Sequence, residues 1–190
     1  MVAVLLCTGL VVGVVAVLVR DDTPGRVGSV TTVGDSLNVG MEPYLDDELR
    51  GWRLRHRNQN GRRTAEGIAE LRALGRDLAP VVVVSLGTND FDADAATFRA
   101  QVDEVLALAG PRRCVVWTTI WLDRPHRLNE VLRDAARRYP NLELADWAGL
   151  VEDEPSALAF DGVHGSPEGY ARRAALVADL VRRCLPEPEP

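Results

Sequence analysis

The sequence predicts an α/β fold in which a parallel sheet is covered by helices on both faces. Strand and helix signals alternate after residue 26, and the segments between the strands have the apolar spacing of amphipathic helices. The run Val81-Val82-Val83-Val84 is apolar without interruption, as in a central strand buried on both faces. Because five strand–helix units follow one another, we expect a single three-layer α/β/α domain with a five-stranded parallel sheet.

The elements follow from local patterns in chain order. We expect strands at Val27–Val33, Trp52–Arg57, Val81–Val84, Cys114–Trp121 and Leu142–Trp147. We expect helices at Leu37–Leu49, from an N-cap at Thr64, from near Ala95 to Ala109, around Leu128–Tyr139, and after Ser166-Pro167. The remaining stretch from Trp147 to Gly165 is predicted to be a long loop. This arrangement is flavodoxin-like, and it spans residues 27–185.

The first 20 residues have a different composition from the rest. Val2 to Val19 is an uncharged run of 18 residues, which as a helix would span ~27 Å, close to the apolar thickness of a bilayer. We expect a hydrophobic helix at 1–20, acting as a transmembrane signal anchor or as a cleaved signal peptide. The absence of a small-residue cleavage site after the run favours the anchor. Residues 21–26 are predicted to be a linker and residues 186–190 a disordered tail.

Charge and residue counts exclude several function classes. The net charge of -6 argues against a nucleic-acid partner. The three His and three Cys residues have no zinc-ligand spacing, so we expect no metal, and no glycine-rich phosphate loop is present. We therefore expect chemistry that needs no cofactor.

Candidate catalytic residues follow the predicted strands at one edge of the sheet. Ser36 follows the first strand, Gly61 the second and Asn89 the third, while Asp161 and His164 come after the fifth. The carboxyl ends of parallel strands lie at the same edge, so these residues should meet there. Each has an alternative structural explanation, since Ser caps helices and Asn and Gly form turns. Together they predict a nucleophile, a base with its carboxylate, and oxyanion donors.

These segments resemble the motifs of the GDSL family of serine esterases and acyl hydrolases, also called SGNH hydrolases. The resemblance is carried by Gly34-Asp35-Ser36-Leu37, Gly61, Gly87-Thr88-Asn89-Asp90 and Asp161-Gly162-Val163-His164. It implies that Ser36 attacks an ester carbonyl, His164 moves the proton and Asp161 orients His164. It also implies that the N–H groups of Ser36 and Gly61 and the amide of Asn89 hold the oxyanion.

The resemblance leaves the substrate open, and several interpretations follow. The first is hydrolysis of a small acyl group, such as acetyl, from a glycan or another ester outside the cytoplasm. The alternatives are acyl transfer between cell-envelope glycans, lipase or thioesterase action on longer chains, and a non-catalytic carbohydrate-binding module. Asp35, Arg62 and Trp121 are candidate substrate-binding residues. Family members with a hydrophobic leader are usually exported, so we expect a domain anchored to the outer face of a bacterial membrane, or secreted after cleavage.

Cys114 and Cys184 are predicted to lie at the sheet edge opposite the active site. Cys114 begins the fourth strand, and Cys184 ends the last helix, which runs antiparallel to the strands. A disulfide would suit an exported domain, whereas two buried thiols would suit any compartment. The sequence leaves both alternatives open.

Overall fold

A computed structural model describes residues 28–123 and 126–184. These residues form one parallel sheet in the order β2-β1-β3-β4-β5, which confirms the α/β fold with a five-stranded parallel sheet. The strands are β1 (Ser29–Gly34), β2 (Arg53–Asn58), β3 (Val81–Ser85), β4 (Cys114–Thr118) and β5 (Leu142–Ala145). The expected N-terminal hydrophobic helix, the linker and the C-terminal tail lie outside the described residues. Within the described part of the chain, no helix is both long and apolar enough to cross a bilayer.

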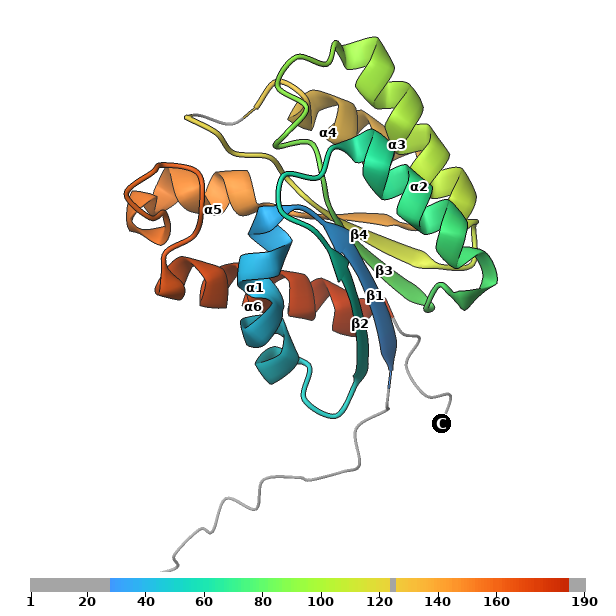
Figure 1. Ribbon diagram of the computed structural model, residues 1–190, viewed down its shortest axis with the longest axis horizontal. Helices are drawn as coiled ribbons and strands as arrows, with labels where there is room; N and C mark the ends of the chain where they lie inside the picture. Colours follow the sequence, from blue (N-terminus) through green and yellow to red (C-terminus); the bar gives the residue numbers. More distant parts are fainter. Residues whose placement is uncertain (1–27, 124–125, 185–190) are drawn as a thin grey trace, which may run out of the picture.

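Helices cover both faces of the sheet (Figure 1). One face carries α2 (Thr64–Leu74), α3 (Ala95–Ala109) and α4 (Asn129–Arg138), and the other carries α1 (Ser36–Glu48) and α6 (Pro167–Arg183). A shorter helix, α5 (Trp147–Asp153), follows β5, and the 3₁₀ turns η1 (Gly75–Asp77) and η2 (Pro155–Ala157) complete the chain. The layers therefore match the sequence prediction.

Each face of the sheet packs against its own apolar cluster. Val82 and Val84 of β3 join the cluster under α2, α3 and α4, whereas Val81 and Val83 join the cluster under α1 and α6. All four valines have no exposed surface. Alternating side chains point to opposite faces of a strand, so a central strand with helices on both sides must be apolar throughout.

The ends of the last two strands differ from the prediction. Strand β4 ends at Thr118. Thr119 N still donates to Ala145 O at 2.9 Å, but the backbone of Ile120 bonds to the side chain of Asn129, which accepts from its N–H at 2.7 Å and donates to its carbonyl at 2.8 Å. Strand β5 stops at Ala145 because Asp146 caps α5, its carboxylate accepting from Gly149 N at 3.2 Å. The predicted long loop from Trp147 therefore contains a helix.

A second difference concerns the start of α2. Thr64 is its first helical residue, and Arg63 is the N-cap, with its N–H donating to Glu66 Oε2 at 2.8 Å. Thr64 was a plausible cap by residue type, but its hydroxyl donates instead to Asp90 Oδ2 at 2.6 Å. A tertiary contact here replaces the local one.

A disulfide closes the edge of the sheet opposite the carboxyl ends of the strands. It joins Cys114 at the start of β4 to Cys184 just after α6, with 5.7 Å between the Cα atoms. The bond spans a sequence separation of 70 residues, and it fixes the end of the last helix to the start of β4.

Candidate active site

Ser36 is the first residue of α1 and follows β1 directly. The preceding Asp35 is the N-cap, and its Oδ1 accepts from the N–H of Leu37 at 3.0 Å. The first N–H groups of a helix have no intrahelical acceptor and lie at the positive end of its dipole. Among the described residues, the N–H of Ser36 donates to no protein acceptor. Ser36 therefore combines a hydroxyl with a free backbone donor.

A chain of hydrogen bonds runs from Asp161 through His164 to Ser36. His164 Nε2 lies 2.9 Å from Ser36 Oγ, and His164 Nδ1 lies 2.7 Å from Asp161 Oδ2. An Nδ1–H that donates to the carboxylate leaves Nε2 as the acceptor for the serine hydroxyl. The arrangement can thus take a proton from Ser36 and stabilise the resulting imidazolium.

The loop that carries His164 is held by short-range hydrogen bonds. Asp161 Oδ1 accepts from Val163 N at 3.0 Å and from His164 N at 2.9 Å. These bonds, together with the bond to the His164 side chain, lower the pKa of the Asp161 carboxyl to about 2. Asp161 is therefore ionised at neutral pH and faces the imidazole as a carboxylate.

Asn89 lies against the loop that contains Gly61. Its Nδ2 donates to the carbonyl of Arg62 at 3.1 Å and approaches Asp35 Oδ2 at 3.4 Å. Gly61 has φ 72, a left-handed conformation that favours glycine, and in the described part of the chain its N–H donates to no protein acceptor. The structure thus brings the two predicted loop donors together beside the residue that precedes Ser36.

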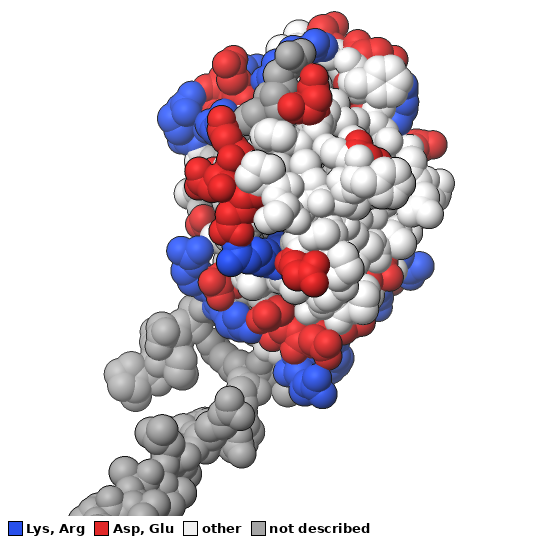
Figure 2. Space-filling view, turned by 90° about the vertical axis from the view of Figure 1, so that its left-hand side faces the viewer, with Lys and Arg blue, Asp and Glu red and all other residues white. Residues whose placement is uncertain are grey.

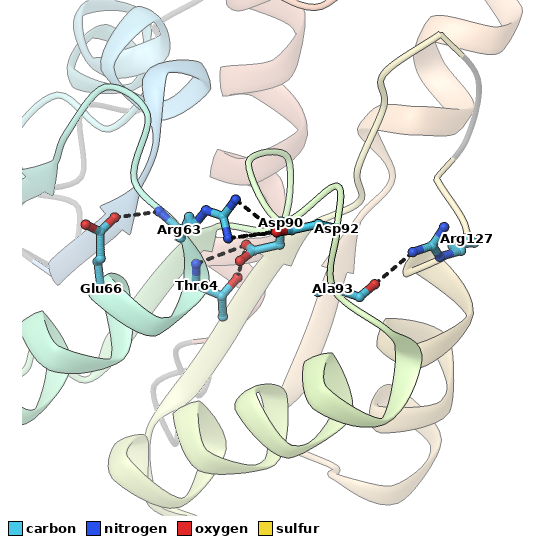
Figure 3. Close-up of polar contacts among 7 residues, drawn as sticks. All are labelled: Arg63, Thr64, Glu66, Asp90, Asp92, Ala93 and Arg127. Carbon is cyan, nitrogen blue, oxygen red and sulfur yellow. Dashed lines mark hydrogen bonds and ion pairs between the residues drawn. The ribbon is translucent and has the colours of Figure 1, made fainter.

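The turn after Asn89 is fixed to the start of α2 (Figure 3). Asp90 is buried, and its Oδ2 accepts from Thr64 N at 3.0 Å and from Thr64 Oγ1 at 2.6 Å. Arg63 bonds to Asp92 with 3.1 Å between Nη1 and Oδ1. Arg127 Nη2 donates to Ala93 O at 2.8 Å on the other side. Asp90 belongs to the sequence motif, but its role in holding this turn comes from the structure.

Arg173 of α6 lies beneath the site and was not identified from the sequence. It is buried, and its Nη2 donates to Ser85 Oγ at 2.7 Å and to Thr118 Oγ1 at 2.8 Å, at the ends of β3 and β4. Its guanidinium lies 5.0 Å from the ring centre of Trp147. A signal was present, because Arg173 is three residues after Tyr170 and four before Val177, on the inner stripe of the helix.

Asp35 and Arg173 are two buried charges that act on each other. Burial raises the pKa of Asp35 to about 6, and the charge of Arg173 opposes that rise. Burial also lowers the pKa of Arg173 to about 10, so Arg173 remains charged at neutral pH. The Ser36 turn therefore has an ionisable group and its counter-charge directly below it.

The predicted substrate-binding residues have other surroundings than expected. Asp35 has no exposed surface, because its side chain turns inward to cap α1. Arg62 is also buried, because its guanidinium donates to the carbonyl of Arg57 and to Gln59 Oε1, which closes its own loop. Both side chains are bonded within the protein, and a contact of either with substrate stays a prediction. Trp121 packs against the cluster of Trp147, Val151 and Ala157, and its contact with substrate stays a prediction.

The site residues offer no evident metal set. Within residues 28–123 and 126–184, no group of three or more His, Cys, Asp or Glu side chains could hold a metal ion. The groups that the site presents are a hydroxyl, an imidazole, a carboxylate and an amide.

Comparisons with known proteins bear on this geometry. The O-acetyltransferase OatA of Staphylococcus aureus (strain NCTC 8325 / PS 47) is 25% identical over 162 residues, which cover 83% of this chain and 25% of OatA. The chain thus spans about a quarter of the length of this curated relative.

Two solved structures share the fold. A lipase/acylhydrolase from Enterococcus faecalis superposes with a TM-score of 0.72 at 21% identity, covering 86% of this chain and 99% of that one. The C-terminal catalytic domain of Streptococcus pneumoniae peptidoglycan O-acetyltransferase A gives a TM-score of 0.64 at 19% identity, covering 83% and 92%. The model of the GDSL-like Lipase/Acylhydrolase family matches residues 29–172, most of the chain, and the protein therefore belongs to this family.

Proposed function

We propose that this protein is a serine-dependent esterase that removes a small acyl group, such as acetyl, from its alcohol. The observation that carries the proposal is the continuous hydrogen-bond chain from Asp161 Oδ2 through His164 to Ser36 Oγ, with distances of 2.7 and 2.9 Å. A serine hydroxyl is a weak nucleophile until a base accepts its proton. The proposed role of His164 is to accept that proton as Ser36 Oγ bonds to the ester carbonyl carbon.

The oxyanion formed in this step needs donors that are already oriented. We assign this role to the N–H groups of Ser36 and Gly61 and to the side-chain amide of Asn89. Removing one such donor typically costs ~2.7–4 kcal/mol of transition-state stabilisation. One N–H of the Asn89 amide donates to the Arg62 carbonyl at 3.1 Å, and the proposal requires the other, whose nitrogen lies 3.4 Å from Asp35 Oδ2, to donate to the oxyanion.

The catalytic cycle then closes without a cofactor. His164 returns the proton to the departing alkoxide, and the alcohol leaves an acyl group on Ser36 Oγ. Water attacks this acyl-enzyme while His164 takes one of its protons. Collapse of the second tetrahedral intermediate breaks the bond to Ser36 Oγ, which recovers its proton from His164 as the acid is released.

The openness of the site favours a small acyl group. The side chains of His164 and Asp161 are each 40% exposed, so the catalytic pair is open to solvent. A long acyl chain gains ~0.8 kcal/mol for each methylene that is buried, and an open site buries few. We expect kcat/KM to fall as the acyl chain grows from acetyl or butyryl to dodecanoyl.

Acyl transfer to a cell-envelope glycan is the second candidate, with the same residues and a sugar hydroxyl in place of water. The similarity to the O-acetyltransferase OatA favours it, at 25% identity over 162 residues. The two candidates differ in the fate of the acyl-enzyme. Incubation with an acetyl donor and a sugar oligomer, followed by mass spectrometry, distinguishes acetylated oligomer from free acetic acid.

The direct test of the proposed function is Ser36→Ala. We expect hydrolysis of 4-nitrophenyl acetate to fall by at least about 10³-fold, since only binding and the oxyanion donors would remain. Ser156→Ala, an exposed residue of η2, is the matched control and should retain wild-type activity. A serine-reactive phosphonate should label wild-type protein at Ser36. A folded Ser36→Ala variant with most of the wild-type rate would refute the mechanism.

We also propose that the domain works outside the cytoplasm, attached to a membrane through residues 1–20. The uncharged run of 18 residues supports this, and the Cys114–Cys184 disulfide suits an oxidising compartment. Full-length protein should sediment with membranes and resist extraction by high salt. A mature N-terminus beyond Val19 would instead identify a secreted protein.

A further inference from the structure

Two turns beside the active site each present an exposed phenylalanine. Phe91 is 64% exposed and Phe160 is fully exposed, and these are the large apolar side chains that the described residues leave in solvent. Phe91 comes two residues after Asn89, and Phe160 directly precedes Asp161. Single exposed apolar residues are common on protein surfaces. Here both lie on the loops that carry the site, and both turns are fixed by hydrogen bonds.

The turn of Phe91 is held on both sides of the ring. Ala93 N donates to Asp90 O at 3.0 Å and closes the turn, while the Asp90 carboxylate is fixed by Thr64. Asp92 is paired with Arg63 (Figure 3). The guanidinium of Arg63 lies 5.6 Å from the centre of the Phe91 ring. An apolar ring is thus kept in water by the contacts of its two neighbours.

The turn of Phe160 is closed in a similar way. Gly162 N donates to Ala159 O at 3.0 Å, and Ala159 N donates to His164 O at 2.8 Å. The same turn holds the Asp161 carboxylate against His164. Phe160 therefore lies in the same turn that places the base.

We propose that Phe91 and Phe160 bind sugar rings of the alcohol half of the ester, so that the substrate is an acylated glycan. This inference rests on the proposed function of Ser36. The C–H face of a pyranose ring packs against an aromatic ring, and its hydroxyls need polar partners. Arg63 and Asp92, with side chains 47% and 57% exposed, supply such partners beside Phe91.

The surrounding charge favours a neutral sugar over a lipid surface. Asp92 and its partner Arg63 adjoin Phe91, Asp161 follows Phe160, and the whole chain has a net charge of -6. Figure 2 shows a broad uncharged area on the side of the molecule that lies on the left in Figure 1, with acidic and basic side chains around it. Anionic headgroups attract basic residues and repel such a surface. A neutral glycan carries no such penalty.

The test compares two substrates in variants of the two rings. Vinyl acetate, which has no ring, reports the acyl chemistry, and O-acetylated oligosaccharides from xylan, chitin and peptidoglycan report glycan recognition. For the oligosaccharide that the wild type prefers, we expect Phe91→Ala and Phe160→Ala each to lower kcat/KM about tenfold, mainly through KM. Hydrolysis of vinyl acetate should stay within about twofold of wild type in both, because neither ring touches a small ester.

Replacements that retain one property of the ring sharpen the test. Phe160→Trp keeps an aromatic face and should retain glycan turnover. Phe160→Leu stays apolar but has no aromatic face, and it should lose turnover as Phe160→Ala does. Three results overturn the proposal: Phe160→Leu retains glycan turnover, the alanine variants lose the same rate on the oligosaccharide and on vinyl acetate, or the wild type hydrolyses every oligosaccharide with a kcat/KM no higher than that for vinyl acetate. If Phe91→Ala and Phe160→Ala reduce binding to phosphatidylglycerol vesicles and leave glycan turnover unchanged, the rings bind a membrane and the proposal fails. In each case vinyl acetate hydrolysis that depends on Ser36 would leave the proposed function intact.

Discussion

The site has a buried floor and an exposed rim, and they are built in opposite ways. The floor consists of Asp35, Ser85, Thr118 and Arg173. Its hydrogen bonds join residues 88 and 55 positions apart, and all four residues are buried. The rim is the turn 89–93 and the loop 160–164, where Asp161 bonds to residues two and three positions away and is 40% exposed. The floor is thus assembled by the fold, while much of the rim is set by local sequence.

The two aspartates nearest Ser36 illustrate this difference. Burial raises the pKa of Asp35 to about 6, whereas hydrogen bonds from Val163 and His164 lower that of Asp161 to about 2. Asp161 stabilises the fold above the unfolded-state pKa near 3.8, and this contribution is lost as pH falls toward 2. Asp35 has the opposite effect, because ionising a buried carboxyl destabilises the fold as pH rises toward neutrality.

The largest effect is expected from a rim variant that keeps its shape. Asp161→Asn should lower kcat for 4-nitrophenyl acetate by about 10³–10⁴-fold, because an amide no longer fixes the imidazole tautomer or stabilises the imidazolium. Asp153→Asn, at the exposed end of α5, is the control and should leave kcat unchanged. Steady-state kinetics on folded protein decide the matter, and a loss below tenfold would exclude Asp161 as the orienting carboxylate.

Substitution of Arg173 in the floor should lower the free energy of unfolding. Arg173→Met removes the donor to Ser85 Oγ and Thr118 Oγ1 and a buried charge that acts on Asp35, so the free energy of unfolding should fall, by about 1–3 kcal/mol for each buried hydroxyl left without its partner. Urea denaturation measures this loss. The double variant Asp35→Asn/Arg173→Met should recover part of it, since no charge is then left uncompensated. An Arg173→Met protein within about 0.5 kcal/mol of wild type would show that the pair has no structural role.

This difference between floor and rim also explains what the sequence could predict. Ser36 and the rim residues Asn89, Asp161 and His164 belong to short motifs at predicted strand ends, so sheet topology alone brings them to one edge. The five strands were likewise recognisable from apolar patterns.

The rest depends on tertiary contacts that no local pattern specifies. The buried guanidinium of Arg173 finds its acceptors in Ser85 and Thr118. Arg62 turns inward because a carbonyl of β2 accepts a hydrogen bond from its guanidinium. The sequence pattern does not predict helix α5, because Trp147 fits the apolar end of a strand. In the structure, Asp146 instead caps a helix that begins at Trp147. Short motifs therefore predict the candidate chemistry, and the fold supplies its support.

A smaller effect is expected in the pH dependence of stability. With a pKa of about 6 against 3.8 in the unfolded chain, ionisation of Asp35 should cost wild type about 2 kcal/mol between pH 4.5 and 7. Asp35→Asn can still cap α1 but does not ionise. Whatever its stability at pH 4.5, the variant should therefore gain about 2 kcal/mol relative to wild type at pH 7. Parallel stability curves for the two proteins would contradict a buried, titrating Asp35.

The smallest predicted effect concerns a buried hydrogen bond that joins the start of α2 to the turn 89–93 of the rim. Thr64 Oγ1 donates to Asp90 Oδ2 at 2.6 Å, and both residues are buried. Thr64→Val keeps the volume but removes this hydroxyl, so Asp90 retains the bond from Thr64 N alone, at a cost of about 1.5 kcal/mol. Because Asp90 follows Asn89, kcat for vinyl acetate should also fall, whereas Thr64→Ser should preserve both stability and rate. A Thr64→Val protein that loses stability but keeps its full kcat would show that Asp90 holds the turn without positioning the oxyanion donor.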